Sequence, residues 1–274
     1  MGSLVIAGPR WGSVVKHQQV LDKLAARGHV QALDEELARW VHRQMCRPAD
    51  AYEDLAREVI TPVRARWRCV LEADDVPSLT KNVVRVALAT VLHKYGFQDA
   101  AVTAEAVEAV DELNREVVLS DAFERQSADI KAFLRSTPEP LTHKPRRPRS
   151  LTFLRPGDVL SIELGGRFHA AYVWKVTGVN EIPVIEFYTG TFAGPPVLTD
   201  LVGREAARPG GRARFGVEGL TYLPDPAHQV RAVAAAHPEG PRGGEPGPGQ
   251  GLYAGTDVMT LQRDIVDLFG AIAV

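Results

Sequence analysis

The chain has 274 residues, a length that suits one large domain or two ordinary ones. Hydrophobic residues make up 45% of it, which is close to the average of globular proteins and argues against global disorder. Its formal net charge is −2, which argues against a protein that binds nucleic acid or an anionic membrane over its whole surface.

The sequence predicts no targeting or membrane segment. The N-terminal residues lack a cationic segment followed by a long apolar run, so we expect no signal peptide. No stretch approaches the roughly 18 uninterrupted apolar residues of a membrane span. Two cysteines, Cys46 and Cys69, are too few for a disulfide scaffold, and we expect reduced thiols in the cytoplasm.

Residues 15–135 are predicted to be helical, because Gly and Pro are sparse and good helix formers are frequent. Apolar residues at helical spacing predict a helix from His29 to Cys46, which ends at Arg47-Pro48. Asp50 is expected to cap the next helix, and Thr61-Pro62 resembles the start of another.

Further along the bundle, residues 79–95 are apolar on several faces, which predicts a central helix that stops at Gly96. Thr103 and Ser120 are predicted to cap two more helices, and the second of these reaches about Leu134.

Residues 136–150 contain four prolines and are predicted to be an extended linker at a domain boundary. After residue 151 the apolar period changes to two, which predicts strands over 159–164, 168–176 and 182–188, with a hairpin at Gly165-Gly166. Residues 215–223 are a candidate fourth strand. A Gly- and Pro-rich surface loop is expected at 238–251, followed by an amphipathic helix from Val258 that Thr256 or Asp257 caps.

The predicted fold class is therefore α+β. An N-terminal α-helical bundle (1–135) precedes the linker (136–150) and a small antiparallel, barrel-like β-rich domain with a C-terminal helix (151–274).

Few residues point to catalysis or to a metal. His42 and Cys46 lie four residues apart on one helix, and Cys69 could be a third ligand, but structural zinc sites normally use four such ligands. A catalytic thiol is not expected in the middle of a helix. We therefore predict no catalytic residue of a known motif, no metal and no cofactor. Acidic residues that could include an acid–base pair are Asp158, Glu163, Glu186 and Asp200.

Two basic runs allow a different hypothesis. The first run is Lys144, Arg146, Arg147 and Arg149, and the second, between Arg204 and Arg214, also contains Arg208 and Arg212. Together with Phe168, Tyr172 and Trp174 they could form a nucleic-acid surface, in which bases stack on aromatic rings. A solvated linker and core aromatic residues are the simpler interpretation.

The segment RPGDVLSIELGGRFHAAYVWKV and the following IPVIEFYTGTF carry a Gly157-Asp158-Val159 opening, a Gly turn, an aromatic–Ala strand and Glu186-Phe187-Tyr188. This pattern resembles the Immunity protein 26 family of bacterial polymorphic toxin systems. The resemblance covers residues 153–192 and extends weakly to the C-terminal helix, whereas the helical region lies outside it.

The resemblance implies a non-catalytic protein that binds and neutralises a cognate toxin or effector, or that acts in a defence system. Candidate contacts are Trp174, Tyr188 and Phe192 as aromatic anchors and Glu186 as a charged rim residue. For each of these residues the alternative role is core packing or a structural turn, and for Trp174 this is the simpler interpretation. Two alternatives are a nucleic-acid-binding module and an enzyme with a site between the domains. The sequence does not give the partner, the role of the helical half or the oligomeric state.

Overall fold

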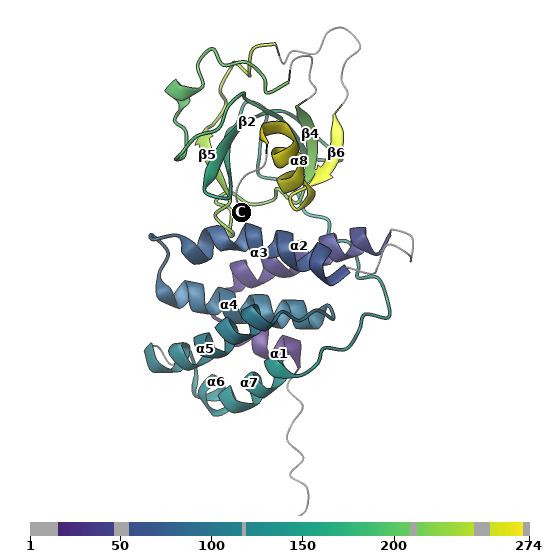
Figure 1. Ribbon diagram of the computed structural model, residues 1–274, viewed down its shortest axis with the longest axis vertical. Helices are drawn as coiled ribbons and strands as arrows, with labels where there is room; N and C mark the ends of the chain where they lie inside the picture. Colours follow the sequence, from purple (N-terminus) through teal and green to yellow (C-terminus); the bar gives the residue numbers. More distant parts are fainter. Residues whose placement is uncertain (1–15, 47–54, 117–118, 209–212, 244–252, 271–274) are drawn as a thin grey trace, which may run out of the picture.

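The computed structural model describes residues 16–46, 55–116, 119–208, 213–243 and 253–270. Its N-terminal half is helical, and its C-terminal half holds a mixed sheet, a short 3-10 helix and, among the described residues, one α-helix, so the protein has the predicted α+β class (Figure 1). None of the helices in these residues is long and apolar enough to cross a membrane. The predicted features at Arg47-Pro48, Asp50 and Arg212, and residues 244–251 of the predicted Gly- and Pro-rich loop, lie outside the described residues.

The helical half has α4 at its centre, where it contacts α1, α2, α3 and α5. Its buried side chains include Val84, Leu88 and Val91, as expected for a helix that is apolar on several faces. The helices of this half are α1 (His17–Leu21), α2 (Arg27–Gln44), α3 (Leu55–Glu72), α4 (Ser78–Lys94), α5 (Ala100–Glu116), α6 (Asp121–Arg125) and α7 (Ser127–Arg135).

Two predicted helix starts are wrong. Helix α3 runs without a break through Pro62, because side chains of other helices satisfy the backbone around the proline. Helix α5 begins at Ala100, where Asp99 Oδ1 accepts a hydrogen bond of 2.9 Å from the backbone N–H of Val102, so Thr103 lies inside the helix. The predicted cap at Ser120 is confirmed: its Oγ accepts a hydrogen bond of 3.1 Å from Phe123 N.

The sheet has the strand order β5-β1-β2-β3-β4-β6. The first four neighbouring pairs are antiparallel, whereas β4 and β6 are parallel. Among the described residues β5 and β6 are the two edges, so the sheet is open and does not close into a barrel. Its strands are β1 (Val159–Leu164), β2 (Arg167–Thr177), β3 (Ile182–Phe187), β4 (Arg214–Glu218), β5 (Val230–Ala234) and β6 (Ala254–Asp257).

Helix α8 (Thr260–Phe269) covers the inner face of the sheet, where Phe269 packs edge-on against Phe187 with ring centroids 5.8 Å apart. Asp257 caps the helix as predicted, because its Oδ1 accepts hydrogen bonds from Met259 N and Thr260 N. Leu261 and Ile265 are buried on its apolar stripe.

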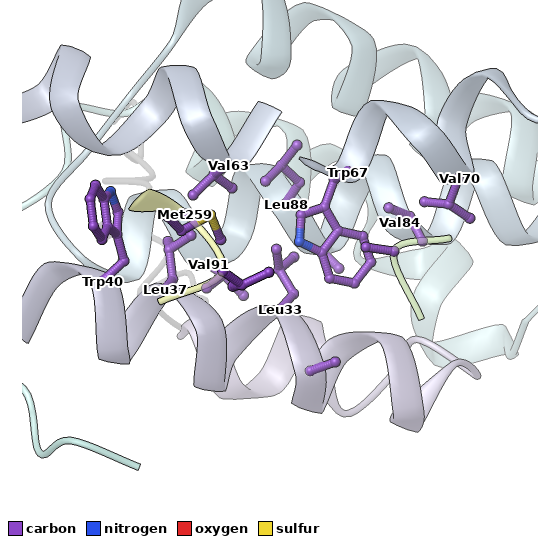
Figure 2. Packing of buried hydrophobic residues seen from close by; sticks show 14 of the residues in the cluster. Leu33, Leu37, Trp40, Val63, Trp67, Val70, Val84, Leu88, Val91 and Met259 are labelled. Carbon is purple, nitrogen blue, oxygen red and sulfur yellow. The ribbon is translucent and has the colours of Figure 1, made fainter. Parts of the chain in front are cut away.

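The helical half and the sheet share one hydrophobic core. Met259, which precedes α8, lies beside Leu37 of α2 and Val63 of α3 (Figure 2). Gln262 of α8 donates a hydrogen bond of 2.9 Å to the carbonyl oxygen of Pro62. The two halves are therefore joined by packing as well as by the chain.

Residues 136–158 form no helix or strand and run along the side of the helical half toward the sheet (Figure 1). Their contacts attach them to both halves: the carbonyl oxygen of Pro145 is hydrogen-bonded to the His42 ring, and Arg147 forms an ion pair of 2.8 Å with Glu218 of β4. Prolines keep this segment extended, as predicted, while its polar groups fix it in place.

Candidate functional site

Three of the predicted contact residues, Trp174, Tyr188 and Phe192, pack into one cluster on the outer face of the sheet. Trp174 lies on β2, and Tyr188 and Phe192 follow β3. Alternation along the strands places these side chains opposite the face that α8 covers. The structure therefore brings the predicted residues together.

The fourth predicted residue, Glu186, is the centre of this layer and is completely buried. Its Oε2 accepts hydrogen bonds of 2.5 Å from Trp174 Nε1 and of 3.0 Å from Arg214 Nε. The Arg214 guanidinium also lies over the Trp174 ring, 4.5 Å from its centroid. Burial raises the pKa of the Glu186 carboxyl, whereas Arg214 and Trp174 oppose that shift.

This geometry corrects the expected rim position of Glu186, because a buried carboxylate held by Arg214 cannot contact a partner at the surface. Tyr188 is also buried, and burial raises the pKa of its hydroxyl. Trp174 is half-buried, and the backbone of Gly240 lies so close to it that a Cβ there would be 2.8 Å from the ring. The cluster supports the outer face, and Trp174 and Phe192 are its partly exposed members.

Sequence reasoning assigned Arg214 to a basic run, whereas the strand register places it directly opposite Glu186. Only the pairing of β3 with β4 brings the two charges together, and no local pattern predicts that register.

The second basic run does not form one charged surface. Arg214 is buried, Arg204 lies over the Phe192 ring at 4.9 Å, and Arg208 donates to the carbonyl oxygen of Asp267 in α8. Tyr172 is buried as well, and its hydroxyl donates to the carbonyl oxygen of His237. Arg214 and Tyr172 are therefore too buried to contact a nucleic acid.

The first basic run borders a hollow of about 860 Å³ between the linker and α2. Arg146 and Arg149 are exposed there, and Arg147 faces Glu218. Lys144 lies farther back, with its Nζ 3.4 Å from the sulfur of Cys46. The acidic side of the hollow is Glu35, whose Oε2 accepts a hydrogen bond from Ser150.

The residues considered as metal ligands each have other surroundings. The His42 ring is hydrogen-bonded to Pro145, Cys46 is exposed, and Cys69 is buried in α3 with a thiol pKa that burial raises. In the part of the chain that the structure describes, no group of three or more His, Cys, Asp or Glu is placed to hold a metal ion. Glu163 and Glu186, both considered for acid–base chemistry, lie in different surroundings. Glu186 is buried and paired with Arg214, whereas Glu163 lies beside the β1–β2 turn, where its Oε1 accepts a hydrogen bond from Gly166 N.

The junction between the halves is filled by an ionic network around Arg66 of α3. Arg66 pairs with Glu36 of α2 at 2.5 Å and with Asp225, in the loop before β5, at 2.7 Å. Burial alone lowers the pKa of the Arg66 guanidinium, but the two carboxylates outweigh it and raise the pKa. The cavity beside this network has a volume of about 10 Å³, which holds about one water molecule and no substrate.

A second hollow of about 350 Å³ opens where α3 meets α8. Its walls are mainly apolar and include Trp40, Pro62, Leu164, Met259 and Val266. This hollow is larger than the cavity beside Arg66. Its charged lining residues are Arg57 and Glu58 of α3 and Arg263 of α8.

Three exposed apolar residues lie together at the β2–β3 turn. Thr152 N donates a hydrogen bond of 2.8 Å to the carbonyl oxygen of Asn180, which places residues 151–153 beside the turn. Leu151 and Phe153 are each 63% exposed, and Val179 is 86% exposed. We call Leu151, Phe153 and Val179 the hairpin-tip surface.

Val179 adopts a left-handed backbone conformation with φ of 61°. For a β-branched residue this conformation is strained, at a cost of about 1–2 kcal/mol. The sequence predicts strands on both sides of this turn but not the strain at Val179, because the strain depends on the φ value that the hairpin imposes.

Comparisons with known proteins add no relative: no protein family, no curated protein and no solved structure matches this chain.

Proposed function

We propose that this chain is a non-catalytic protein-binding protein of the immunity type, which neutralises a cognate bacterial toxin or acts in a defence system by covering a partner protein. The observation that carries the proposal is the hairpin-tip surface. Val179 is held outward in a strained conformation, and its side chain gains no burial within the chain. Strained and exposed apolar residues are typical of sites that contact a partner.

The hairpin-tip surface has the arrangement of a small binding epitope. Phe153 supplies an aromatic anchor, and Leu151 and Val179 add aliphatic area around it. Arg149 lies two residues before Leu151 and Glu181 two residues after Val179, so both signs of charge are available at the edge. Such a polar rim sets the rate and specificity of association.

The Glu186 cluster has a supporting role in this proposal. Trp174 lies on β2, and Tyr188 directly follows β3. The Glu186–Arg214 ion pair joins β3 to the neighbouring strand β4. A rigid hairpin lowers the entropy cost of presenting the tip to a partner.

The proposal is tested by co-expression with the product of the neighbouring gene, followed by co-purification and measurement of growth. We expect a stable complex and rescue of growth, and loss of both when Phe153→Asp and Val179→Asp are combined. The matched control is Val202→Asp, since Val202 is 72% exposed and lies outside the hairpin tip. A complex that is insensitive to the double substitution would place the interface elsewhere, and no complex or rescue would count against the function itself.

A nucleic-acid-binding function is the second candidate, and the hollow beside Arg146 and Arg149 favours it. It predicts binding of an oligonucleotide that weakens steeply as salt increases and after charge reversal at Arg146 and Arg147. Salt-insensitive binding, or none, would remove this candidate.

A further inference from the structure

Two histidines form a hydrogen bond between the first helix and the centre of the helical half. His17 begins α1, and His93 lies in the last turn of α4. Their ring nitrogens, His17 Nε2 and His93 Nδ1, are 3.0 Å apart. The Phe133 ring of α7 packs against both imidazoles, with its centroid 5.0 Å from that of His17 and 4.5 Å from that of His93. Three helices therefore meet at this pair of rings.

The hydrogen-bond network assigns the protons on the two rings. His93 Nε2 lies 3.1 Å from both the carbonyl oxygen and the Oγ of Ser136. The carbonyl oxygen can only accept, and the Ser136 hydroxyl donates its own proton to the carbonyl oxygen of Phe133 at 2.7 Å. His93 Nε2 must therefore carry a hydrogen. In the neutral ring this leaves Nδ1 as the acceptor for the N–H at His17 Nε2.

This pair can bind one additional proton but not two. A first proton makes one ring an imidazolium, which still donates a hydrogen bond to the neutral nitrogen of the other ring. A second proton places an N–H on each of two nitrogens that face each other at 3.0 Å, and it brings two positive charges together. His93 is only 7% exposed, so burial makes the doubly protonated pair still less favourable.

The charges around the pair do not offset this repulsion. Lys94 of α4, which acts on the His17 ring, is itself a cation, and its Nζ is 2.8 Å from both carboxylate oxygens of Asp34 in α2. Lys16, which precedes α1, and Arg135, the last residue of α7, are cations too. In the part of the chain that the structure describes, no carboxylate pairs with either ring. Burial, as the largest effect, lowers the pKa of both histidines.

Helix α1 is attached to the bundle by few contacts. It has five residues, and α1 and α7 lie at the end of the helical half away from the sheet (Figure 1). It contacts α4, and the buried side chains of Val20, Leu21 and Leu24 supply its apolar packing. Among the described residues, His17 makes the one hydrogen bond that joins a side chain of α1 to another helix. A short peripheral element of this kind opens at a lower free energy than the core of a protein.

We propose that the His17–His93 pair is a pH-sensitive switch that attaches α1 to α4 near neutral pH and releases residues 16–24 in acid. Released rings bind protons as ordinary histidines do, whereas the attached pair binds a second proton poorly, so acid favours the released state. Release uncovers the apolar surface of α4 that Val20, Leu21 and Leu24 contact at neutral pH. The proposal concerns the helical half alone and does not depend on the hairpin-tip surface.

The experiment measures amide hydrogen–deuterium exchange of the full chain by mass spectrometry at about pH 7.5 and about pH 5. Peptides that cover residues 16–24 report on release of α1, and peptides from α5 report on the rest of the helical half. The exchange rates are corrected for the intrinsic pH dependence of amide exchange. We expect the corrected exchange of residues 16–24 to be at least about tenfold faster at the lower pH, while that of α5 stays unchanged.

Two variants remove the titration from either side of the pair. His93→Asn keeps an amide oxygen as the acceptor for His17 and cannot be protonated, so residues 16–24 should stay protected at the lower pH. His17→Phe keeps a ring against Phe133 and carries no charge, and it should also make their exchange insensitive to pH. His143→Asn is the matched control, because His143 is exposed in the linker, and this variant should lose protection like the parent chain. Far-UV circular dichroism at neutral pH shows that each variant is folded.

Three results would overturn the proposal. They are equal corrected exchange of residues 16–24 at the two pH values, exchange at the lower pH that His93→Asn leaves as fast as in the parent chain, and loss of protection in α5 together with residues 16–24. The last result would mean that acid unfolds the whole bundle and not α1 alone. The combined Phe153→Asp/Val179→Asp variant should release α1 like the parent chain, so failure of the switch and failure of the proposed function are distinguishable.

Discussion

The indole Nε1 of Trp40 donates a hydrogen bond of 2.9 Å to the carbonyl oxygen of Glu58, the backbone acceptor that lacks its helical donor because Pro62 lies four residues later. The side chain of one helix thus replaces a backbone hydrogen bond of another. The carbonyl oxygen of Pro62 itself accepts from Gln262, so the irregular point of α3 is bound by both α2 and α8.

This relationship predicts energetic coupling between Trp40 and Pro62. We expect Trp40→Phe to destabilise the protein by about 1–2 kcal/mol through the lost hydrogen bond, in addition to any packing loss. In a Pro62→Ala background, residue 62 supplies its own N–H, and Trp40→Phe should cost about 1 kcal/mol less. Urea unfolding of the four proteins measures the coupling. Additive effects would show that the indole does not replace the missing donor.

The network at Arg66 predicts a large effect from one substitution. Arg66→Met leaves Glu36 and Asp225 buried without their cation, and we expect a loss of about 3–5 kcal/mol in the free energy of unfolding. Arg68→Met is the control, because Arg68 is two residues away, half-buried and only weakly paired, and it should cost less than about 1 kcal/mol.

A triple variant separates the effect of charge from that of hydrogen-bond geometry at the Arg66 network. When Glu36→Gln and Asp225→Asn accompany Arg66→Met, no uncompensated charge remains, and more than half of the loss should be recovered. A triple variant as unstable as Arg66→Met would mean that hydrogen-bond geometry, not charge, stabilises the junction.

The sequence predicts the elements whose signals are local. The α+β class, the Gly165-Gly166 hairpin, the Ser120 cap and the Asp257 cap each depend on a few neighbouring residues, and the structure confirms them. Strands β5 and β6 were not predicted. Each has five or fewer residues and depends on pairing with β1 or β4, which sequence periodicity does not report.

The errors follow from contacts between distant residues. Pro62 was expected to start a helix because it cannot donate a hydrogen bond to the preceding turn. Trp40 of α2 makes that hydrogen bond instead, so α3 continues through the proline. Glu186 appears suited to an exposed rim until the β3–β4 register places Arg214 opposite it. The exposure of the candidate site residues therefore depends on tertiary packing, which the sequence does not report.

His169 predicts a pH dependence of stability. Its ring is fully buried on β2, packs 4.6 Å from the Phe269 ring, and has no hydrogen-bond partner on either nitrogen among the described residues. Burial, with a smaller effect of Arg167, lowers its pKa from 6.5 to about 4. As the pH decreases, the His169 ring is therefore protonated near pH 6.5 in the unfolded chain but only near pH 4 in the folded chain.

Stability should consequently fall as the pH decreases through this window, by up to about 3 kcal/mol from His169 alone. Burial lowers the pKa of His17 and His93 too, so the total slope includes them. His169→Leu should make the protein more stable at neutral pH and remove up to one proton from the slope. Urea unfolding between pH 7 and pH 4 measures both effects, with exposed His143→Leu as the control. Parallel curves for His169→Leu and the parent chain would show that His169 does not titrate as expected.

Val179 predicts opposite effects on folding and on partner binding. Asn adopts the left-handed conformation more readily than a β-branched residue, so Val179→Asn should raise the free energy of unfolding by about 1 kcal/mol. The same change removes apolar area from the hairpin-tip surface and should weaken the proposed complex. Val202→Asn is the matched control, since Val202 is similarly exposed but has no positive φ, and it should leave both quantities nearly unchanged.

Thermal and urea unfolding measure the first effect without any partner, and co-purification measures the second. A gain in stability together with weaker binding is the result expected if the strained valine serves recognition. A gain in stability with unchanged binding would mean that Val179 is strained for a reason unrelated to the interface. A loss of stability would show that the valine side chain makes a packing contribution larger than its backbone strain.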